Sequence, residues 1–238
     1  MNARLPAMGA AAVLCLLFAA AALPLESPYQ RQAASADGIG KVYYGREIAQ
    51  VMGFSGAAWL ERPERAAEER PEWLVEDLHL EPSMVVADIG AGSGYLTRRL
   101  ARHVPKGRVY AVDVQPEMVD FLKAIAAERD FKNVVPILGT PDDVRVPAAS
   151  LDIAVLVDVY HELEFPAEVM RSILRALKPG GRVVFVEYRA EDPAVPIKAL
   201  HKMSEAQVRR EMSDLPLVFE RSSERLPLQH LLVFKKVP

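Results

Sequence analysis

Short apolar runs alternate with longer amphipathic stretches through the central and C-terminal parts of the chain. The clearest run covers residues 84–89 and contains a single charge, Asp88. Continuous apolar runs of this length are typical of parallel strands that are buried on both faces. The same pattern, together with two weaker runs near the C-terminus, predicts strands at residues 84–89, 108–114, 134–138, 151–157, 182–188, 217–221 and 230–235.

Between these strands, apolar residues recur at the spacing of one helix face. In the stretch 71–80, Trp73, Leu74 and Leu78 fall near helical spacing, and Glu72 stands in the first turn. Alternating strands and helices predict an α/β fold with a largely parallel sheet, helices on both faces and right-handed crossovers. Further helices are predicted at residues 95–104, from Pro116 onward, at 166–177 and around 204–212.

The first part of the chain differs from the rest. Residues 5–25 carry no charge, Arg4 precedes them, and Glu26 is the next charged residue. This pattern is typical of a secretory signal, and the run is also long enough to span a bilayer. We expect residues 1–36 to form a signal peptide or N-terminal membrane anchor plus linker, with residues 26–40 as the linker, and to be dispensable for folding. The protein is then exported (periplasmic or secreted) or membrane-anchored rather than cytoplasmic; the alternative is an Ala-rich helix packed on the domain.

Composition and charge narrow the classes of partner and chemistry. Half of the residues are hydrophobic and 26% are charged, which is ordinary for a globular domain. The net charge of −3 gives no basic signature, so nucleic acid is not an expected partner. Cys15 is the only cysteine, which excludes an internal disulfide and a cysteine-rich zinc site. The five histidines lack a metal-binding spacing such as H-E-x-x-H, so no metal site is predicted, and the oligomeric state is left open.

A glycine-rich turn follows the first strand, and an acid ends the second. Residues 90–94 alternate glycine with small residues, which lets the backbone turn tightly and lets a ligand approach it closely. Tyr95 stands where the dinucleotide fingerprint needs a small residue, which disfavours NAD. Asp113 ends the second strand, where a carboxylate can accept both hydroxyls of a ribose. The alternatives are a tight strand-to-helix connection and an acid that complements the helix dipole.

Three segments resemble class I S-adenosylmethionine (SAM)-dependent methyltransferases. Residues 85–94 resemble motif I of that family, residues 109–113 its second-strand motif, and residues 177–182 the turn before its fifth strand. The resemblance covers roughly residues 70–190, and its broader likeness is to small-molecule methyltransferases of the ubiquinone-biosynthesis type. It implies a Rossmann-like, doubly wound, seven-stranded sheet that is mostly parallel with a reversed last strand. It also implies S-adenosyl-L-methionine as the cofactor.

The resemblance further implies cofactor contacts. The glycines of the turn are expected near the methionine part of SAM, Asp113 on the ribose, and Asp88 at the loop or the amino group. One departure concerns adenine: the family often has Gly-Asp-Ala after the third strand, and Thr140 takes the place of that acid here. Asp142, Asp143 and the backbone are the candidates for the adenine contact, and a solvated loop is the alternative for the acid pair. The expected cofactor-binding residues are Asp88, Gly90, Ala91, Gly92, Gly94, Asp113, Val114, Thr140, Asp142 and Asp158.

The fourth strand runs into residues 158–162, which in the family face the transferring methyl and the acceptor. SAM carries its own electrophile, so the protein mainly has to align the acceptor and exclude water. His161 is the candidate general base for a hydroxyl acceptor, and its alternative is a structural or substrate-positioning role. Tyr160 is expected to line the pocket by stacking, which makes His161 and Tyr160 the catalytic candidates. Arg189 and residues 201–203 are further candidates for the acceptor wall.

Residues 37–70 precede this core and contain aromatic and arginine clusters at 43–46 and 59–62. They are expected to form a lid over cofactor and acceptor, with docking on the core as the alternative. Residues 71–238 are expected to form the methyltransferase domain, which transfers a methyl group from SAM to a small-molecule acceptor. A membrane is a second expected partner, through the N-terminal apolar segment. The alternatives are a protein methyltransferase similar to isoaspartyl-repair enzymes and a SAM-binding module without activity.

Overall fold

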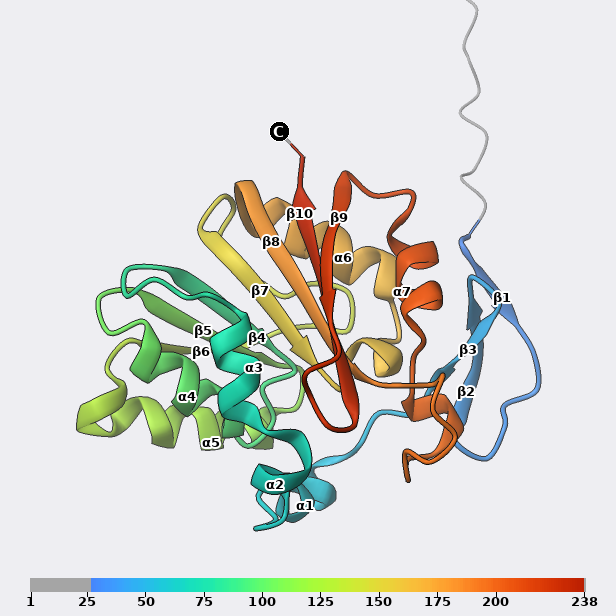
Figure 1. Ribbon diagram of the computed structural model, residues 1–238, viewed down its shortest axis with the longest axis horizontal. Helices are drawn as coiled ribbons and strands as arrows, with labels where there is room; N and C mark the ends of the chain where they lie inside the picture. The colour runs from blue at the N-terminus through green and yellow to red at the C-terminus, as the bar shows by residue number, and fades with distance from the viewer. Residues whose placement is uncertain (1–26, 238) are drawn as a thin grey trace, which may run out of the picture.

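A seven-stranded sheet forms the centre of the molecule, which the computed structural model describes over residues 27–237 (Figure 1). The strands are β4 (Val85–Ile89), β5 (Arg108–Asp113), β6 (Val134–Leu138), β7 (Leu151–Val157), β8 (Leu177–Tyr188), β9 (Leu217–Ser223) and β10 (Gln229–Lys236). Their order is β6-β5-β4-β7-β8-β10-β9. Neighbouring strands from β6 to β8 in this order are parallel, and β10 is antiparallel to both β8 and β9. The predicted doubly wound sheet with a reversed last strand is confirmed.

The register of the sheet brings three strand ends to one edge. β4 pairs in parallel with β5 and with β7, so that Ile89 lies opposite Val112 on one side and Leu156 on the other. The residues that end or follow these strands therefore start from neighbouring positions. They are the glycine turn after β4, Asp113 at the end of β5 and Asp158 directly after β7. This is the edge at which open α/β sheets bind ligands.

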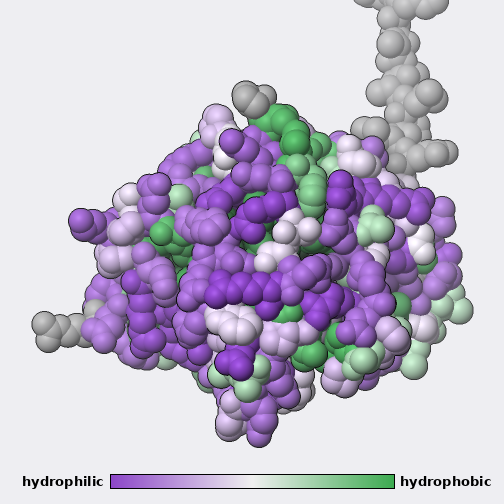
Figure 2. All heavy atoms as spheres, viewed as in Figure 1, coloured by the Kyte–Doolittle hydropathy of each residue, from purple (hydrophilic) through white to green (hydrophobic). Residues whose placement is uncertain are grey.

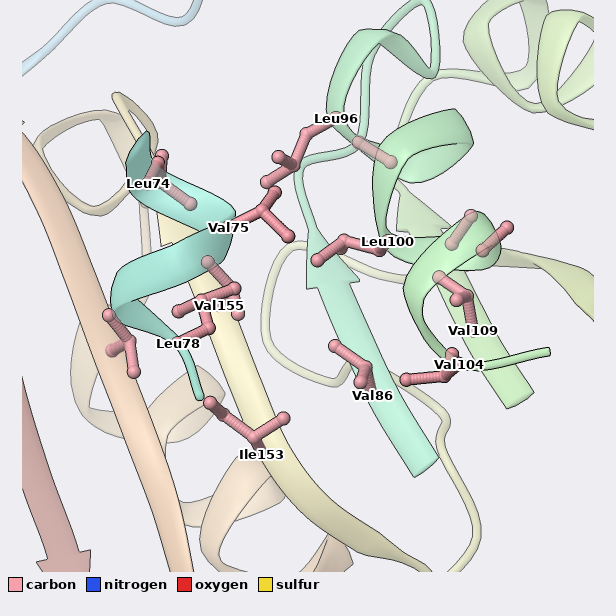
Figure 3. Close-up of a cluster of buried hydrophobic side chains, with 14 of the residues drawn as sticks. Leu74, Val75, Leu78, Val86, Leu96, Leu100, Val104, Val109, Ile153 and Val155 are labelled. Atoms are coloured by element: carbon pink, nitrogen blue, oxygen red, sulfur yellow. The ribbon is translucent and has the colours of Figure 1, made fainter. Parts of the chain in front are cut away.

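Helices cover both faces of the sheet, as predicted. One face carries α3 (Pro71–Asp77), α4 (Tyr95–His103) and α5 (Pro116–Ala127), and the other carries α6 (Pro166–Ala176) and α7 (Glu205–Met212). Helices α5 and α6 each begin at a proline, whose fixed φ suits the first helical position. Burial of each large apolar side chain contributes about 1.5–3 kcal/mol to folding. Side chains of α3 and α4 meet over β4 and β7 in a cluster that includes Leu74, Val75, Leu78, Val86, Leu96, Leu100, Ile153 and Val155 (Figure 3).

A second, three-stranded antiparallel sheet packs beside the first (Figure 1). It consists of β1 (Tyr29–Arg31), β2 (Gly38–Tyr43) and β3 (Arg46–Ala49). The Tyr29 hydroxyl donates a hydrogen bond to the carboxylate of Glu168 and accepts one from the Ala167 N–H at 3.1 Å. The linker expected over residues 26–40 is therefore wrong where the chain forms β1 and the start of β2. These residues are ordered by partners that lie far away in the sequence.

Between β3 and α3 the chain forms the short 3₁₀ helix η1 (Phe54–Gly56) and the helices α1 (Ala57–Leu60) and α2 (Arg65–Glu69). The apolar segment at residues 5–25, expected to be a signal or an anchor, lies outside the described residues. Within residues 27–237, no helix combines the length and the apolar character needed to cross a membrane. Figure 2 shows a face of the molecule that is covered mostly by hydrophilic residues.

Candidate active site

A cavity of about 850 Å³ lies at the carboxyl edge of the parallel strands. The glycine turn after β4 and the residues after β5 and β7 form its floor and sides. The segment between β3 and α2 covers it, and the 3₁₀ helix η4 (Ala199–His201) closes a further side. Of the ten expected cofactor residues, eight line this cavity: Asp88, Gly90, Ala91, Gly92, Asp113, Val114, Thr140 and Asp158.

The glycine turn has a backbone that other residues rarely adopt. Gly90, Gly92 and Gly94 have φ angles of +70°, +54° and +79°. At Gly90 an added Cβ would stand 2.5 Å from the Val159 side chain, and at Gly94 it would stand 2.3 Å from Cδ1 of Ile125. Gly94 does not line the cavity, so its role is to let the turn pack on α5. The expectation of a cofactor contact at Gly94 is corrected in this sense.

Asp113 ties the end of β5 to this turn. Its Oδ2 accepts a hydrogen bond from the Gly92 N–H at 2.9 Å, and its Oδ1 accepts one from the Gln115 N–H at 2.9 Å. Burial raises the pKa of Asp113 above its ordinary value, although these two N–H groups oppose the shift. Each carboxylate oxygen has a second lone pair, so both can still accept a hydroxyl donor from the cavity.

Asp88 lies beneath the turn at the end of β4. It is buried, and its Oδ2 accepts a hydrogen bond from the Thr97 hydroxyl at 2.6 Å. Burial raises the pKa of Asp88 to about 6, although the Thr97 hydroxyl acts in the opposite direction. The carboxyl group therefore braces the start of α4 while one side of it lines the cavity.

Asp158 follows β7 with a φ of +53°, in the left-handed region. Its Oδ2 accepts a hydrogen bond from Nε2 of Gln229 at 2.7 Å. The buried Oδ1 has no hydrogen-bond partner among the described residues. Burial and the carboxylates of Glu69 and Glu187 raise the pKa of Asp158 well above its ordinary value. An acceptor atom of this kind at a cavity wall is suited to a cationic donor from a ligand.

The loop after β6 differs from the expectation at one acid. Thr140 lines the cavity, and its N–H donates to the carbonyl of Asp143 at 2.8 Å. Asp142 does not line the cavity, so an adenine contact at Asp142 would need this loop to shift. Asp143 lines it in part, but its Oδ2 is paired with Arg175 at 2.8 Å. Thr140 and the local backbone are left as the candidates for adenine.

A compact cluster of His161, Glu162 and His201 forms the opposite side of the cavity. Nδ1 of His161 lies 2.6 Å from Oε2 of Glu187, and its Nε2 lies 3.2 Å from Nδ1 of His201. Oε1 of Glu162 lies 3.1 Å from the same His201 nitrogen, and its Oε2 accepts a hydrogen bond from the Met52 N–H at 3.1 Å. One polar network thus joins the segments after β3 and β7 to Glu187 in β8 and to His201 in η4.

The charges of this cluster decide what His161 can do. Burial lowers the pKa of His161, but the carboxylates of Glu187 and Glu162 outweigh it and raise the value to about 10. Burial likewise raises the pKa of Glu162, but hydrogen bonds with His161 and His201 lower it to about 2. The two carboxylates therefore favour the protonated imidazole of His161 at neutral pH. Because a protonated imidazole cannot accept another proton, this state supports the positioning alternative over a general base.

Tyr160 and Arg189 do not reach the cavity. Tyr160 is fully buried, and its ring packs edge-on against Phe185 with centroids 4.9 Å apart. The guanidinium of Arg189 donates to the carbonyls of Leu226 and Gln229 at 3.0 and 2.7 Å. The expected stacking role of Tyr160 is wrong, because its side chain is buried in the core from the 3₁₀ helix over Tyr160–Glu162. Arg189 closes a loop instead of binding an acceptor.

The lid expected over residues 37–70 divides into two parts. Met52, Trp59 and Leu60 line the cavity, and the Met52 carbonyl accepts a hydrogen bond from Nε2 of Gln115 at 3.1 Å. Arg46, by contrast, docks on the core: its side chain pairs with Glu211 at 2.7 Å and donates to the His161 carbonyl at 3.0 Å. The sequence does not single out Met52 or Gln115, because Met52 acts through its main-chain groups and the Gln115 side chain meets it only where the segment crosses the cavity.

The residues on the side of the glycine turn fit SAM by their chemistry. SAM presents a ribose diol, an ammonium group and a sulfonium cation, and Asp88, Asp113 and Asp158 place three carboxyl groups around that space. The free Oδ1 of Asp158 suits a cationic donor, and Gly90 and Gly92 leave the backbone open to close approach.

Comparisons with known proteins agree with this geometry. The family described as "Methyltransferase domain" matches residues 80–225. An uncharacterised methyltransferase of Mycobacterium tuberculosis is 37% identical over 102 residues, which are 42% of this chain and 38% of the relative. A methyltransferase of Schizosaccharomyces pombe, also uncharacterised, is 30% identical over 157 residues, 66% of this chain and 58% of the relative. The chain spans less than two thirds of the length of these relatives.

Among solved structures, a SAM-dependent methyltransferase from Aquifex aeolicus is similar with a TM-score of 0.73 and 24% identity, over 79% of this chain and all of that one. At this level of identity the likeness concerns the fold. With more than half of its length matched by the family, the chain belongs to the methyltransferase domain family and has the fold of class I SAM-dependent methyltransferases.

Proposed function

We propose that the protein is an enzyme that transfers the methyl group of SAM to a small molecule bound in the same cavity. The observation that supports this most directly is the cavity itself. Its volume of about 850 Å³ lies in the upper part of the range of about 300–1,000 Å³ that is typical of ligand sites. The carboxyl groups around the glycine turn suit the cofactor, and the His161 side offers a second polar wall for an acceptor.

On the cofactor side, SAM supplies an electrophilic methyl group when it is bound. Gly90 and Gly92 admit a ligand against the main chain, and Asp113 is the candidate for the ribose hydroxyls. The free oxygen of Asp158 is the candidate for the ammonium group. These residues hold and orient a ligand, and none of them has to take part in bond breaking.

On the acceptor side, three polar side chains face the cavity from His161, Glu162 and His201. Trp59 and Leu60 provide apolar cover, which helps to exclude water from the reacting centre. The role of this side of the cavity is therefore to hold one polar atom of the acceptor in line with the methyl group.

A small acceptor suits this cavity better than a protein chain. The segment between β3 and α2 covers the cavity, and Met52 is hydrogen-bonded to both Gln115 and Glu162. A polypeptide substrate would need this segment to move aside. Two archaeal relatives, from Pyrococcus horikoshii and Aeropyrum pernix, are protein-L-isoaspartate O-methyltransferases with 32% and 30% identity over about half of this chain. Isoaspartyl peptides are therefore the second acceptor class to test.

The experiment supplies SAM labelled in its methyl group and separates three acceptor pools: small molecules from a cell extract, an isoaspartyl peptide and unmodified protein. We expect label in the small-molecule pool and release of S-adenosylhomocysteine. The Asp113→Ala variant serves as the matched control and should transfer little label. Transfer to the isoaspartyl peptide alone would replace the proposed acceptor class. Saturable SAM binding without transfer to any pool would favour a binding module.

A further inference from the structure

The cluster of His161, Glu162 and His201 has the composition of a metal site. The sequence offers no metal-binding spacing here, because the second histidine lies 40 residues after the first. The fold brings them together where the loop after β7 meets η4. Two imidazoles and one carboxylate are also the ligand set of several catalytic zinc sites. Within residues 27–237, this is the cluster in which ligand atoms of at least three His, Cys, Asp or Glu side chains lie close enough together to hold a metal ion.

The distances between the three ligand atoms match one side of a coordination polyhedron. Nε2 of His161 lies 3.2 Å from Nδ1 of His201, Nδ1 of His201 lies 3.1 Å from Oε1 of Glu162, and Oε1 of Glu162 lies 3.6 Å from Nε2 of His161. Ligands at about 2.0–2.1 Å from Zn²⁺ stand roughly 2.8–3.0 Å from one another in octahedral geometry and roughly 3.3–3.4 Å in tetrahedral geometry. One point can therefore lie about 2 Å from all three atoms with little movement of the side chains.

The surrounding contacts orient these ligands. The other ring nitrogen of His161 faces the Glu187 carboxylate at 2.6 Å, which is the carboxylate–histidine arrangement that typically supports a bound metal. Glu187 is itself held by the Tyr160 N–H at 2.9 Å. The second oxygen of Glu162 accepts the Met52 N–H, which leaves its Oε1 directed to the two histidines.

The open side of the cluster faces the reaction space. His161 is buried, whereas Glu162 and His201 keep 13% and 21% of their side chains exposed, and all three line the cavity. Three protein ligands leave at least one coordination position free, as in catalytic rather than structural metal sites. That position would point to the side of the cavity on which the acceptor is proposed to bind.

We propose that Nε2 of His161, Nδ1 of His201 and Oε1 of Glu162 bind a divalent first-row transition metal ion, with Zn²⁺ as the representative. The open position takes an oxygen atom of the acceptor, so the acceptor class is one with a metal-binding hydroxyl, phenol or carboxylate. This choice of acceptor rests on the proposed function, whereas metal binding does not. Metal binding requires His161 to give up the proton that its carboxylate neighbours favour. The alternative is that this proton stays and that hydrogen bonds alone hold the cluster.

The test measures metal binding by the full chain without SAM or acceptor. The protein is stripped with a chelator, desalted and titrated with Co²⁺, whose visible absorption reports its coordination; Zn²⁺ is then added as a competitor. We expect one equivalent of Co²⁺ to bind, with the absorption of a nitrogen- and oxygen-ligated site, and Zn²⁺ to displace it. A protein that takes up neither ion stoichiometrically at micromolar concentration would overturn the proposal.

Three variants show whether the ion binds at this cluster. His201→Ala and Glu162→Gln remove one ligand each at partly exposed positions and should weaken Co²⁺ binding by at least about 100-fold. His103→Ala, on the outer surface of α4, is the matched histidine control and should bind like the wild type. Equal affinity in His201→Ala and the wild type would place the ion elsewhere and overturn the proposal.

A thermal melt of the metal-free variants checks that they are folded, and a SAM titration of each separates the two proposals. Near wild-type SAM affinity in a variant that has lost Co²⁺ shows that the cofactor side is intact. If the wild-type protein binds Co²⁺ but does not bind SAM, the result counts against the proposed function and leaves the metal site standing.

Discussion

The side chain of Asp113 accepts a hydrogen bond from the backbone N–H of Gly92 at 2.9 Å, so the end of β5 holds the glycine turn that follows β4 in shape. The carboxylate that is the candidate for the ribose is thus also part of the frame of the cavity. Ligand affinity and local stability should therefore respond together when this residue is changed.

Asp113→Ala should weaken SAM binding and also lower the stability of the ligand-free protein. Loss of two charge-assisted hydrogen bonds to the ribose, with some recovery by water, should cost about 2–4 kcal/mol, or roughly 30- to 1000-fold in affinity. The N–H groups of Gly92 and Gln115 also lose their acceptor, which should cost about 1–2 kcal/mol of stability. A SAM titration beside a thermal melt measures both effects. Asp113→Asn should lie between, and wild-type SAM affinity in a folded Asp113→Ala protein would refute the ribose assignment.

Gly92 and Gly94 should respond differently to the same substitution. Alanine at either φ costs about 1–2 kcal/mol of stability. Gly94→Ala should cost more, because its Cβ would lie 2.3 Å from Cδ1 of Ile125, whereas at Gly92 the nearest atom is the flexible end of Leu60 at 2.8 Å. Gly92 lines the cavity, so only Gly92→Ala should also weaken SAM binding, by about 10-fold or more. Equal losses of SAM affinity in two folded variants would contradict this division.

Asp88 should make stability depend on pH. Its pKa of about 6 in the folded protein lies above the ordinary value of 3.8, so the folded state favours the protonated carboxyl group. The favourable contribution of the protonated Asp88 to the free energy of unfolding is complete below pH 3.8 and is lost as the pH rises through about 6. Asp88→Asn keeps an acceptor for Thr97 without the charge and should gain about 2–3 kcal/mol relative to wild type between pH 4 and pH 7. Unfolding curves of both proteins across this range measure it.

An exposed acid provides the control for this effect. Asp120→Asn removes the charge of an exposed carboxylate on α5 and is measured over the same pH range as the control for the substitution itself. A pH-independent difference for Asp88→Asn would mean that Asp88 does not carry the shifted pKa.

The N-terminal boundary of the folded unit should lie before Tyr29. A chain that begins at Ser27 should be as stable as the full protein over the described fold. A chain that begins at Asp37 lacks β1, including the contacts of Tyr29 with Ala167 and Glu168, and should lose about 2–3 kcal/mol. Chemical denaturation of the two chains checks this, and Tyr29→Ala should reproduce most of the loss. Equal stability would restore the expectation that residues up to 36 are dispensable.

The central sheet could be predicted from the sequence because its signals are local. An apolar run such as residues 84–89 is stable only when both faces are buried, and a glycine turn with an acid after the next strand needs no distant partner to be noticed. For the same reason the positions of Asp88, Gly90 and Asp113 at one sheet edge followed from strand order alone.

The parts that could not be predicted depend on contacts across long stretches of sequence. β1 is short and mostly polar, and the bond between Tyr29 and Ala167 links residues 138 positions apart. His201 contacts His161 across 40 residues of sequence, so no metal-binding sequence motif predicts the contact. Tyr160 and His161 are adjacent in the sequence, but β7 ends before the left-handed Asp158, and both residues lie in a 3₁₀ helix that directs their side chains to different places.

The main chain at Met52 links the two sides of the cavity. Its carbonyl accepts a hydrogen bond from the side-chain amide of Gln115, and its N–H donates one to the carboxylate of Glu162. Gln115 follows Asp113 by two residues, and Glu162 stands beside His161. A ligand that orders this crossing segment from one side reduces the entropy that the second ligand would otherwise lose in ordering it. Since such a gain in binding free energy is reciprocal, cofactor and acceptor are expected to bind cooperatively, each strengthening the other by the same factor.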